Sequence, residues 1–140
     1  MANTAQLTLI SRQRTEEGEE TITETSLQAE YYERNGSLYL LYQESLEGTE
    51  DVIRTCIKLK GGLLEITRKG AVSTRMVFEE GREHLSDYAT PYGCLKIGIR
   101  TESLECLLQG EKMEIHARYC LTSQGEAFSY CDMSILLSPA

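Results

Sequence analysis

The chain has 140 residues, a mass of 15.8 kDa and a formal net charge of −8 at pH 7. This is the length of one domain, and 41% hydrophobic with 26% charged residues is a globular composition, which argues against a disordered chain. The acidity argues against a general nucleic-acid binder, because such a protein needs a positive surface for the phosphate backbone. We therefore expect a single domain over residues 1–140 without general affinity for nucleic acid.

Apolar residues that alternate with polar ones dominate the chain from residue 38 onward. The alternation runs through residues 38–43, 53–59, 72–78, 95–100 and 113–121. A period of two is typical of a strand with one buried face. No long segment shows the 3.6-residue stripe of an amphipathic helix. The sequence therefore predicts an all-β protein.

Short glycine-containing segments separate these runs. Asn35-Gly36 and Gly61-Gly62 are the clearest hairpin turns, since both pairs favour positive φ. Further turn signals occur at Glu47-Gly48, Lys69-Gly70, Glu80-Gly81, Gln109-Gly110 and Gln124-Gly125. About eight to ten strands joined in series predict a single antiparallel meander, and its closure into a β-barrel removes the exposed edges.

The cysteines and the N-terminal sequence suggest a compartment. The five cysteines include no C-x-x-C pair, which argues against a zinc site. The sequence shows no export signal and no apolar stretch of about 20 residues. We therefore expect reduced thiols in a cytoplasmic protein, with no membrane span, no metal and no cofactor.

Charge is distributed unevenly along the meander. Residues 1–51 carry three basic and eleven acidic side chains, whereas residues 52–78 carry six basic and one acidic. One interpretation is a positive face for an anionic ligand. The other, which we favour, is that acidic and basic strands lie side by side and pair across the sheet, since surface charge patches are common and individually contribute little.

A series of short motifs resembles a known family. The motifs are Tyr42-Gln43-Glu44, Arg68-Lys69-Gly70, Phe78-Glu79-Glu80-Gly81, the segment 88–93 (YATPYG) and the segment 95–101 (LKIGIRT). Their order and spacing are similar to those of the YwiB-like bacterial proteins, a domain-of-unknown-function family with a lipocalin-like (calycin) β-barrel. The resemblance extends from about residue 7 to residue 137 and implies a closed antiparallel barrel in a small cytoplasmic protein. It implies no established activity.

The alternation also assigns polar side chains to the barrel lumen. Glu44 follows Tyr42 on the face of Leu38 and Leu40, and Arg68 follows Ile66. These side chains predict a polar site at one end of an apolar lumen, and its candidate ligand-binding residues are Tyr42, Glu44, Arg68, Tyr88, Thr90, Thr101 and Tyr119. We expect Glu44 and Arg68 to form an ion pair, because an unpaired charge inside the lumen is costly.

The favoured hypothesis is that the barrel binds a small amphipathic or anionic molecule. Arg68 would offer its planar guanidinium to a carboxylate or phosphate, tyrosine hydroxyls would orient the ligand, and lumen leucines would hold its apolar part. The alternative is a lumen filled by its own side chains, since an eight-stranded barrel is only just wide enough for them.

Two other functions stay open. One is a small barrel enzyme, an isomerase or hydrolase, that uses Glu44 or His84; a triad of His84, Ser86 and Asp87 is disfavoured, because triads form by spatial and not by sequential proximity. We expect His84 in a solvent-facing connection and His116 on an outer surface. The other is an interaction or homodimerisation module, whose surface would be formed by the alternate residues Tyr31, Tyr39, Leu41 and Ile53.

Overall fold

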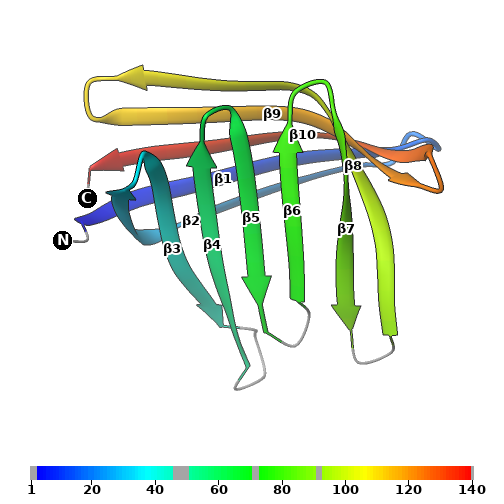
Figure 1. The fold of residues 1–140 in the computed structure, drawn as a ribbon, viewed down its shortest axis with the longest axis horizontal. Helices are drawn as coiled ribbons and strands as arrows, with labels where there is room; N and C mark the ends of the chain where they lie inside the picture. The colour runs from blue at the N-terminus through cyan, green and yellow to red at the C-terminus, as the bar shows by residue number, and fades with distance from the viewer. Residues whose placement is uncertain (1–2, 46–50, 71–72, 91–92, 140) are drawn as a thin grey trace.

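A computed structural model describes residues 3–45, 51–70, 73–90 and 93–139, apart from the side chain of Thr90. The described chain contains ten strands in a closed antiparallel meander and no helix (Figure 1). The strands are β1 (Asn3–Thr15), β2 (Glu20–Arg34), β3 (Ser37–Ser45), β4 (Val52–Lys60), β5 (Leu63–Lys69), β6 (Ser73–Glu79), β7 (Glu83–Thr90), β8 (Gly93–Gln109), β9 (Lys112–Ser123) and β10 (Glu126–Pro139). The predicted all-β barrel is confirmed. No helix in the described part of the chain is long and apolar enough to span a membrane.

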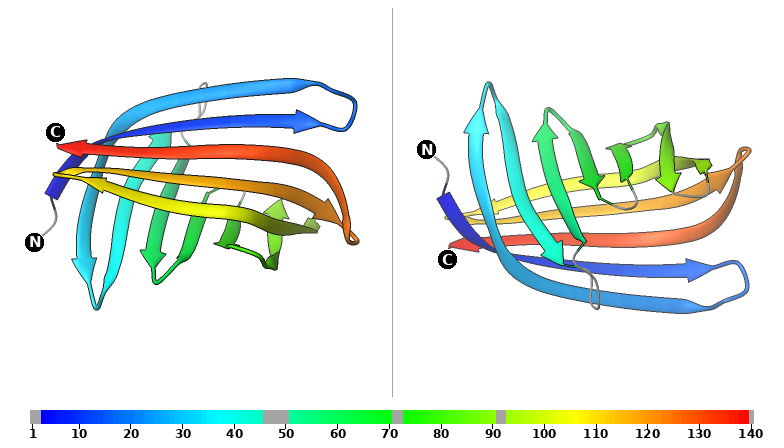
Figure 2. Two further views of the ribbon diagram at one scale, coloured as in Figure 1. Left: turned by 90° about the horizontal axis from the view of Figure 1, so that it is seen from above. Right: turned by 90° about the horizontal axis from the view of Figure 1, so that it is seen from below.

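The barrel consists of two layers of strands that cross each other. In Figure 1, β1, β2, β9 and β10 run across the molecule and β3 to β7 run steeply over them; Figure 2 shows the crossing from above and below. Two strands join the layers. β2 pairs with β1 over residues 20–31 and with β3 over residues 30–34. β8 pairs with β7 over residues 93–100 and with β9 from residue 98 to residue 109.

Tight turns and one closing pair complete the meander. Asn35-Gly36 and Gly61-Gly62 have positive φ at both residues, as the sequence predicts for two-residue hairpin turns. The predicted turn at Glu47-Gly48 lies outside the described residues. The last strand returns to the first, and β1 pairs with β10 from Ala5↔Pro139 to Thr15↔Ser129.

Apolar side chains fill the middle of the lumen. Leu7, Leu64, Phe78 and Ile99 are fully buried there, and they belong to one continuous core cluster contributed by both layers. In β1, β5 and β6, which contain Leu7, Leu64 and Phe78, buried residues alternate with more exposed ones, so the period of two in the sequence does correspond to an inner and an outer face. The lumen is therefore packed at its centre, and a site for a ligand has to lie toward its ends or on the outer surface.

Candidate functional site

A row of polar side chains crosses the inner face of five neighbouring strands. Tyr42 of β3 lies opposite Thr55 of β4, and Thr55 lies opposite Arg68 of β5. Arg68 lies opposite Thr74 of β6, and Thr74 lies opposite Tyr88 of β7. We call these five residues the polar row. They lie toward the end of the barrel where β3, β5 and β7 terminate (Figure 1).

A second polar group faces the lumen from the other layer. Thr101 of β8 lies opposite Tyr119 of β9, which in turn lies opposite Cys131 of β10. Tyr119 is electrostatically coupled to Cys131, Tyr88 and Arg68, so this group and the polar row approach each other across the lumen. The structure thus brings Tyr119 near Arg68 and Tyr88, while Tyr42 lies near Arg68 within the polar row.

Three threonine hydroxyls in these two groups are buried without a partner. The side-chain oxygens of Thr55, Thr74 and Thr101 form no hydrogen bond within the described residues, and none of the three residues is more than 7% exposed. A buried hydroxyl without a partner costs about 1–3 kcal/mol. Such groups are uncommon in folded proteins. Thr55 and Thr74 both lie opposite Arg68 in the strand register, whereas Thr101 lies opposite Tyr119 in the other layer.

Arg68 influences all three tyrosines of the site. Burial raises the pKa values of Tyr42, Tyr88 and Tyr119, and the nearby Arg68 guanidinium lowers each of the three and offsets part of the rise. Because these pKa values lie above the usual value for tyrosine, the hydroxyls stay protonated at neutral pH and are able to donate hydrogen bonds.

The expected ion pair between Glu44 and Arg68 does not form. Glu44 lies opposite Ile53 of β4, whereas Arg68 lies opposite Thr55, two residues further along the same strand. The two charged residues are therefore on opposite sides of β4 and out of register. Neither has an ion pair with any described residue. The physical reason is that Arg68 is exposed to solvent and Glu44 is half-buried, so both charges stay hydrated without each other. Glu44 remains close to Tyr42, whose pKa it raises.

The basic stretch does not pair as we expected. Among the described residues of 52–78, only Arg75 forms an ion pair, with Glu65 at 2.9 Å, and this contact lowers the pKa of Glu65. Arg54 and Lys69 lie directly opposite each other on the outer side of β4 and β5. Cross-strand pairing in this stretch is therefore confirmed for Arg75 alone, and its other basic side chains, all among the described residues, form no ion pair and leave excess positive charge on these strands.

One groove is lined by residues of that positive surface and of the polar row, and Glu30 of β2 also lines it. It has a volume of about 590 Å³, and Tyr42 and Thr55 line it together with Arg54 and Lys69. The sequence analysis omitted Thr55, Thr74 and Cys131 from the candidate site. The sequence does indicate the two threonines as inward residues, because each lies two positions before a buried apolar residue of its strand, Ile57 in β4 and Met76 in β6.

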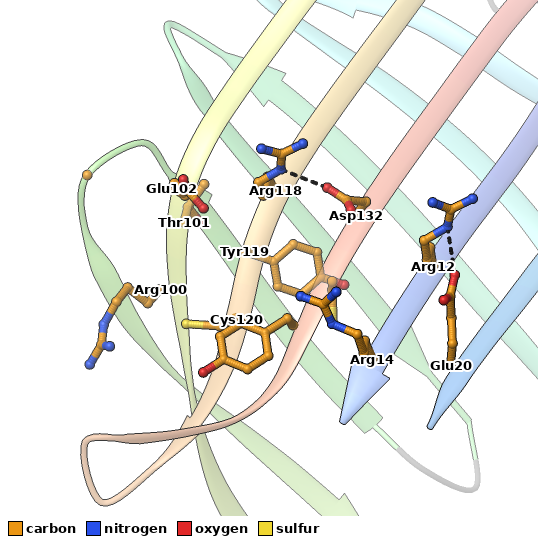
Figure 3. A pocket seen from close by; sticks show the side chains of 13 residues that line it. Arg12, Arg14, Glu20, Arg100, Thr101, Glu102, Arg118, Tyr119, Cys120 and Asp132 are labelled. Atoms are coloured by element: carbon orange, nitrogen blue, oxygen red, sulfur yellow. Dashed lines mark hydrogen bonds and ion pairs between the residues drawn. The ribbon is translucent and has the colours of Figure 1, made fainter. Parts of the chain in front are cut away.

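A larger groove of about 820 Å³ lies along β1, β2, β8, β9 and β10, and Thr101 and Tyr119 line part of it (Figure 3). Its charged lining includes Arg12, Arg14, Arg100 and Arg118. Sequence reasoning missed this cluster. Arg12 and Arg14 come from β1 and are distant in the sequence from Arg100 and Arg118 of β8 and β9, so the closure of the barrel is needed to bring the four together.

Thr90 and the residues of the proposed interaction surface lie outside the polar row. Thr90 pairs with Gly93 through the backbone, and its side chain lies outside the described part. Tyr31 packs against the core and is not on the outer surface where we expected it. Its neighbours on that proposed surface, Tyr39, Leu41 and Ile53, are half-buried.

The two histidines are engaged by neighbouring side chains. His84 lies in β7 and not in a loop, and its Nε2 is 2.9 Å from Glu79 Oε1. Ser86 is buried and donates a hydrogen bond to the Arg75 carbonyl. His116 lies on the outer face, where it contacts Ser134 and Glu114. No group of three or more histidine, cysteine or acidic side chains that could hold a metal ion occurs among the described residues.

Comparisons with known proteins agree with this architecture. The chain is 27% identical to the "Uncharacterized beta-barrel protein YwiB" of Bacillus subtilis (strain 168) over 104 aligned residues. The alignment covers 74% of this chain and 72% of that protein. The crystal structure of the ywiB protein from Bacillus subtilis superimposes with a TM-score of 0.86 at 22% identity, over 99% of this chain and 93% of that one. Residues 7–135 match the family described as "Domain of unknown function (DUF1934)". The chain therefore belongs to the DUF1934 family.

Proposed function

We propose that this protein binds a small organic anion at the end of the barrel where the polar row lies. The observation that carries the proposal is Arg68, which has no ion pair among the described residues and whose two neighbours in the strand register, Thr55 and Thr74, have buried hydroxyls without a hydrogen-bond partner there. A carboxylate or phosphate oxygen would accept hydrogen bonds from both kinds of group.

The charge and the donors of the site favour an anion. The hydroxyls of Tyr42 and Tyr88 stay protonated, since burial raises their pKa values. The Tyr88 hydroxyl donates to Met76 Sδ at 3.9 Å, a weak hydrogen bond that an anion would replace. Arg54 and Lys69 add positive charge along the adjoining groove. In an acidic chain with a net charge of −8, this local excess of positive charge is what an anionic ligand would need.

The packing behind the row limits the size of the ligand. Ile57, Ile66, Met76 and Phe78 continue the same inner face toward the middle of the lumen, and all four are buried in the core cluster. A long apolar chain has no space there. We therefore infer a compact amphipathic anion whose polar head contacts Arg68 and whose short apolar part lies against the tyrosine rings.

The thiols fit a reducing compartment. All five cysteines, two of them exposed, are free and none forms a disulfide. Free thiols persist under the reducing conditions of the cytoplasm, and we propose that the protein acts there.

The test is a nuclear magnetic resonance titration with hexanoate, with hexanol as the uncharged ligand of equal length. Hexanoate should shift the amides of Thr55, Thr74 and Tyr88, and hexanol should not. Arg68→Gln should weaken hexanoate binding about ten-fold, as expected for the loss of a charged hydrogen bond. Arg34→Gln, which removes the same charge at the end of β2 opposite Ser37 and outside this groove, is the matched control and should weaken it much less.

The proposal is wrong if hexanoate shifts none of these amides, if hexanol shifts them equally, or if the Arg68 and Arg34 variants bind equally well. Native mass spectrometry of freshly purified protein would then identify the natural ligand, as a mass that is lost on denaturation and is absent from the Arg68→Gln variant.

A further inference from the structure

The groove of about 820 Å³ in Figure 3, which we call the arginine groove, is distinct from the polar row. Arg12 and Arg14 of β1, Arg100 of β8 and Arg118 of β9 occupy outward positions, whereas the polar row faces the lumen. Glu20, Glu102 and Asp132 also line the groove. Four guanidinium groups and three carboxylates leave one excess positive charge in this groove, on a protein that is strongly acidic overall.

Three of the four arginines already have partners. Arg12 pairs with Glu20 at 3.1 Å and Arg118 pairs with Asp132 at 3.0 Å, as the dashed lines in Figure 3 mark. Arg100 Nη2 lies 3.3 Å from Glu83 Oε1, and it donates a hydrogen bond to the carbonyl of Gly125.

Arg14 differs from the other three arginines. It lies opposite Glu20 in the β1–β2 register, but Glu20 pairs with Arg12. Within the described residues Arg14 therefore has no ion pair and no hydrogen bond from its side chain. In Figure 3 its guanidinium points from β1 toward β9, into the groove. Tyr130 of β10 lies directly opposite Arg14 on the other side and is 43% exposed.

We propose that the arginine groove binds a small molecule that carries a phosphate or diphosphate group, with Arg14 as its main contact. A guanidinium offers two parallel N–H donors that match the spacing of phosphate oxygens. A phosphate also has further oxygens that can accept hydrogen bonds from the exposed guanidinium groups of Arg12 and Arg118 beside Arg14.

The neighbouring ion pairs do not obstruct such a ligand. The side chains of Arg12 and Arg118 are 60% and 63% exposed, and exposed ion pairs contribute little free energy, so these arginines can turn toward a phosphate at small cost. The groove is also larger than a phosphate ion needs and lies in the size range of small-molecule sites. The ring of Tyr130 provides an aromatic surface for an organic group next to the phosphate.

The test is isothermal titration calorimetry with pyrophosphate and with phenyl phosphate. Arg14→Gln should raise the dissociation constant of both ligands about ten-fold, the effect of losing a charge-assisted hydrogen bond. Arg34→Gln, at the far end of β2, is the control that removes an equal charge outside the groove and should leave both affinities within about two-fold. Tyr130→Leu should weaken phenyl phosphate more than pyrophosphate.

Arg68→Gln separates this proposal from the one for the polar row, because it should weaken hexanoate binding about ten-fold and leave pyrophosphate binding unchanged. The proposal is overturned if wild-type protein binds neither phosphate ligand at millimolar concentration, if Arg14→Gln binds pyrophosphate like the wild type, or if Arg34→Gln weakens binding as much as Arg14→Gln. The last result would indicate general charge attraction. Arg14 is exposed and forms no contact that holds the fold, so its variant should melt at the wild-type temperature.

Discussion

The rings of Phe78 and Tyr119 meet edge to face inside the barrel, with centroids 4.8 Å apart and planes inclined at 69°. Phe78 comes from β6 in one layer and Tyr119 from β9 in the other, so the pair joins the two crossed layers. Edge-to-face aromatic pairs add about 0.5–1.5 kcal/mol to the effect of burial alone. Both rings belong to the core cluster, and the Tyr119 ring lies between this packed centre and the polar side chains of the site.

Replacement of Phe78 should test how much the centre of the lumen contributes to stability. Phe78 is fully buried, so Phe78→Ala should lower the free energy of unfolding by about 3–5 kcal/mol through lost burial and a cavity. Phe78→Leu should cost less, since it retains most of the apolar volume. Urea unfolding followed by circular dichroism measures both. A loss below about 1 kcal/mol for the alanine variant would show that the ring is not packed as described.

Tyr119 should make the protein sensitive to alkali. Burial raises the pKa of this hydroxyl above 10.0, the usual value, so the folded protein holds a proton that the unfolded chain releases as the pH passes 10. The contribution of Tyr119 to the free energy of unfolding should therefore be constant below pH 10. Above pH 10 this contribution should decrease by up to about 1.4 kcal/mol per pH unit. Tyr119→Phe should reduce this slope. Urea unfolding at pH 8 and pH 11 measures it, with Tyr130→Phe as the exposed control; equal slopes for wild type and Tyr119→Phe would contradict the prediction.

Two threonines should respond in opposite directions to replacement by valine. Thr74 has a buried hydroxyl without a partner among the described residues, so Thr74→Val should raise the free energy of unfolding of the ligand-free protein by about 1 kcal/mol. Thr122 is equally buried but donates a hydrogen bond to Glu83 at 2.8 Å, so Thr122→Val should lower it by about 1–2 kcal/mol. If the proposed function is correct, Thr74→Val also weakens hexanoate binding. Destabilisation by Thr74→Val would refute this explanation.

Gly98 should tolerate no side chain. A Cβ atom at this position would overlap the Oγ1 atom of Thr122 and would press on the Glu83 carboxylate at 3.2 Å. Gly98→Ala should therefore lower the free energy of unfolding by about 1–3 kcal/mol. Thr122→Ala removes the overlapping atom, so the double variant should lose less stability than the sum of the two single variants. A thermal unfolding series of the four proteins measures this coupling, and strict additivity would contradict it.

The sequence was sufficient to predict the architecture, because a barrel needs little beyond alternation and turns. The strands that contain residues 38–43 and 113–121 are where the period of two indicates them, and Asn35-Gly36 turns the chain as its positive φ preference requires. The inward positions of Tyr42 and Arg68 follow from the same alternation. These properties depend on neighbours within one strand, which a single sequence displays.

Relations between strands were harder to predict. The separation of Glu44 from Arg68 depends on which residue of β4 lies opposite each of them, and the alternation does not specify this register. The arginine groove likewise depends on the bend of β8, where the register shifts between Thr101 and Ser103, and on the return of β10 to β1. A one-residue change in register would reverse the faces, so a small error in pairing is enough to lose such a site.

The order of the strands has a consequence for synthesis of the chain on the ribosome. Every pairing except one joins strands that are consecutive in the sequence, and each can form as soon as its hairpin has been made. The exception is the pairing of β1 with β10, in which Ala5 meets Pro139. The first strand therefore leaves the ribosome many seconds before its second partner exists, at elongation rates of about 5–20 residues per second. During that interval β1 has an unpaired edge, and the nascent barrel is most prone to pair with a neighbouring chain just before its last strand is released.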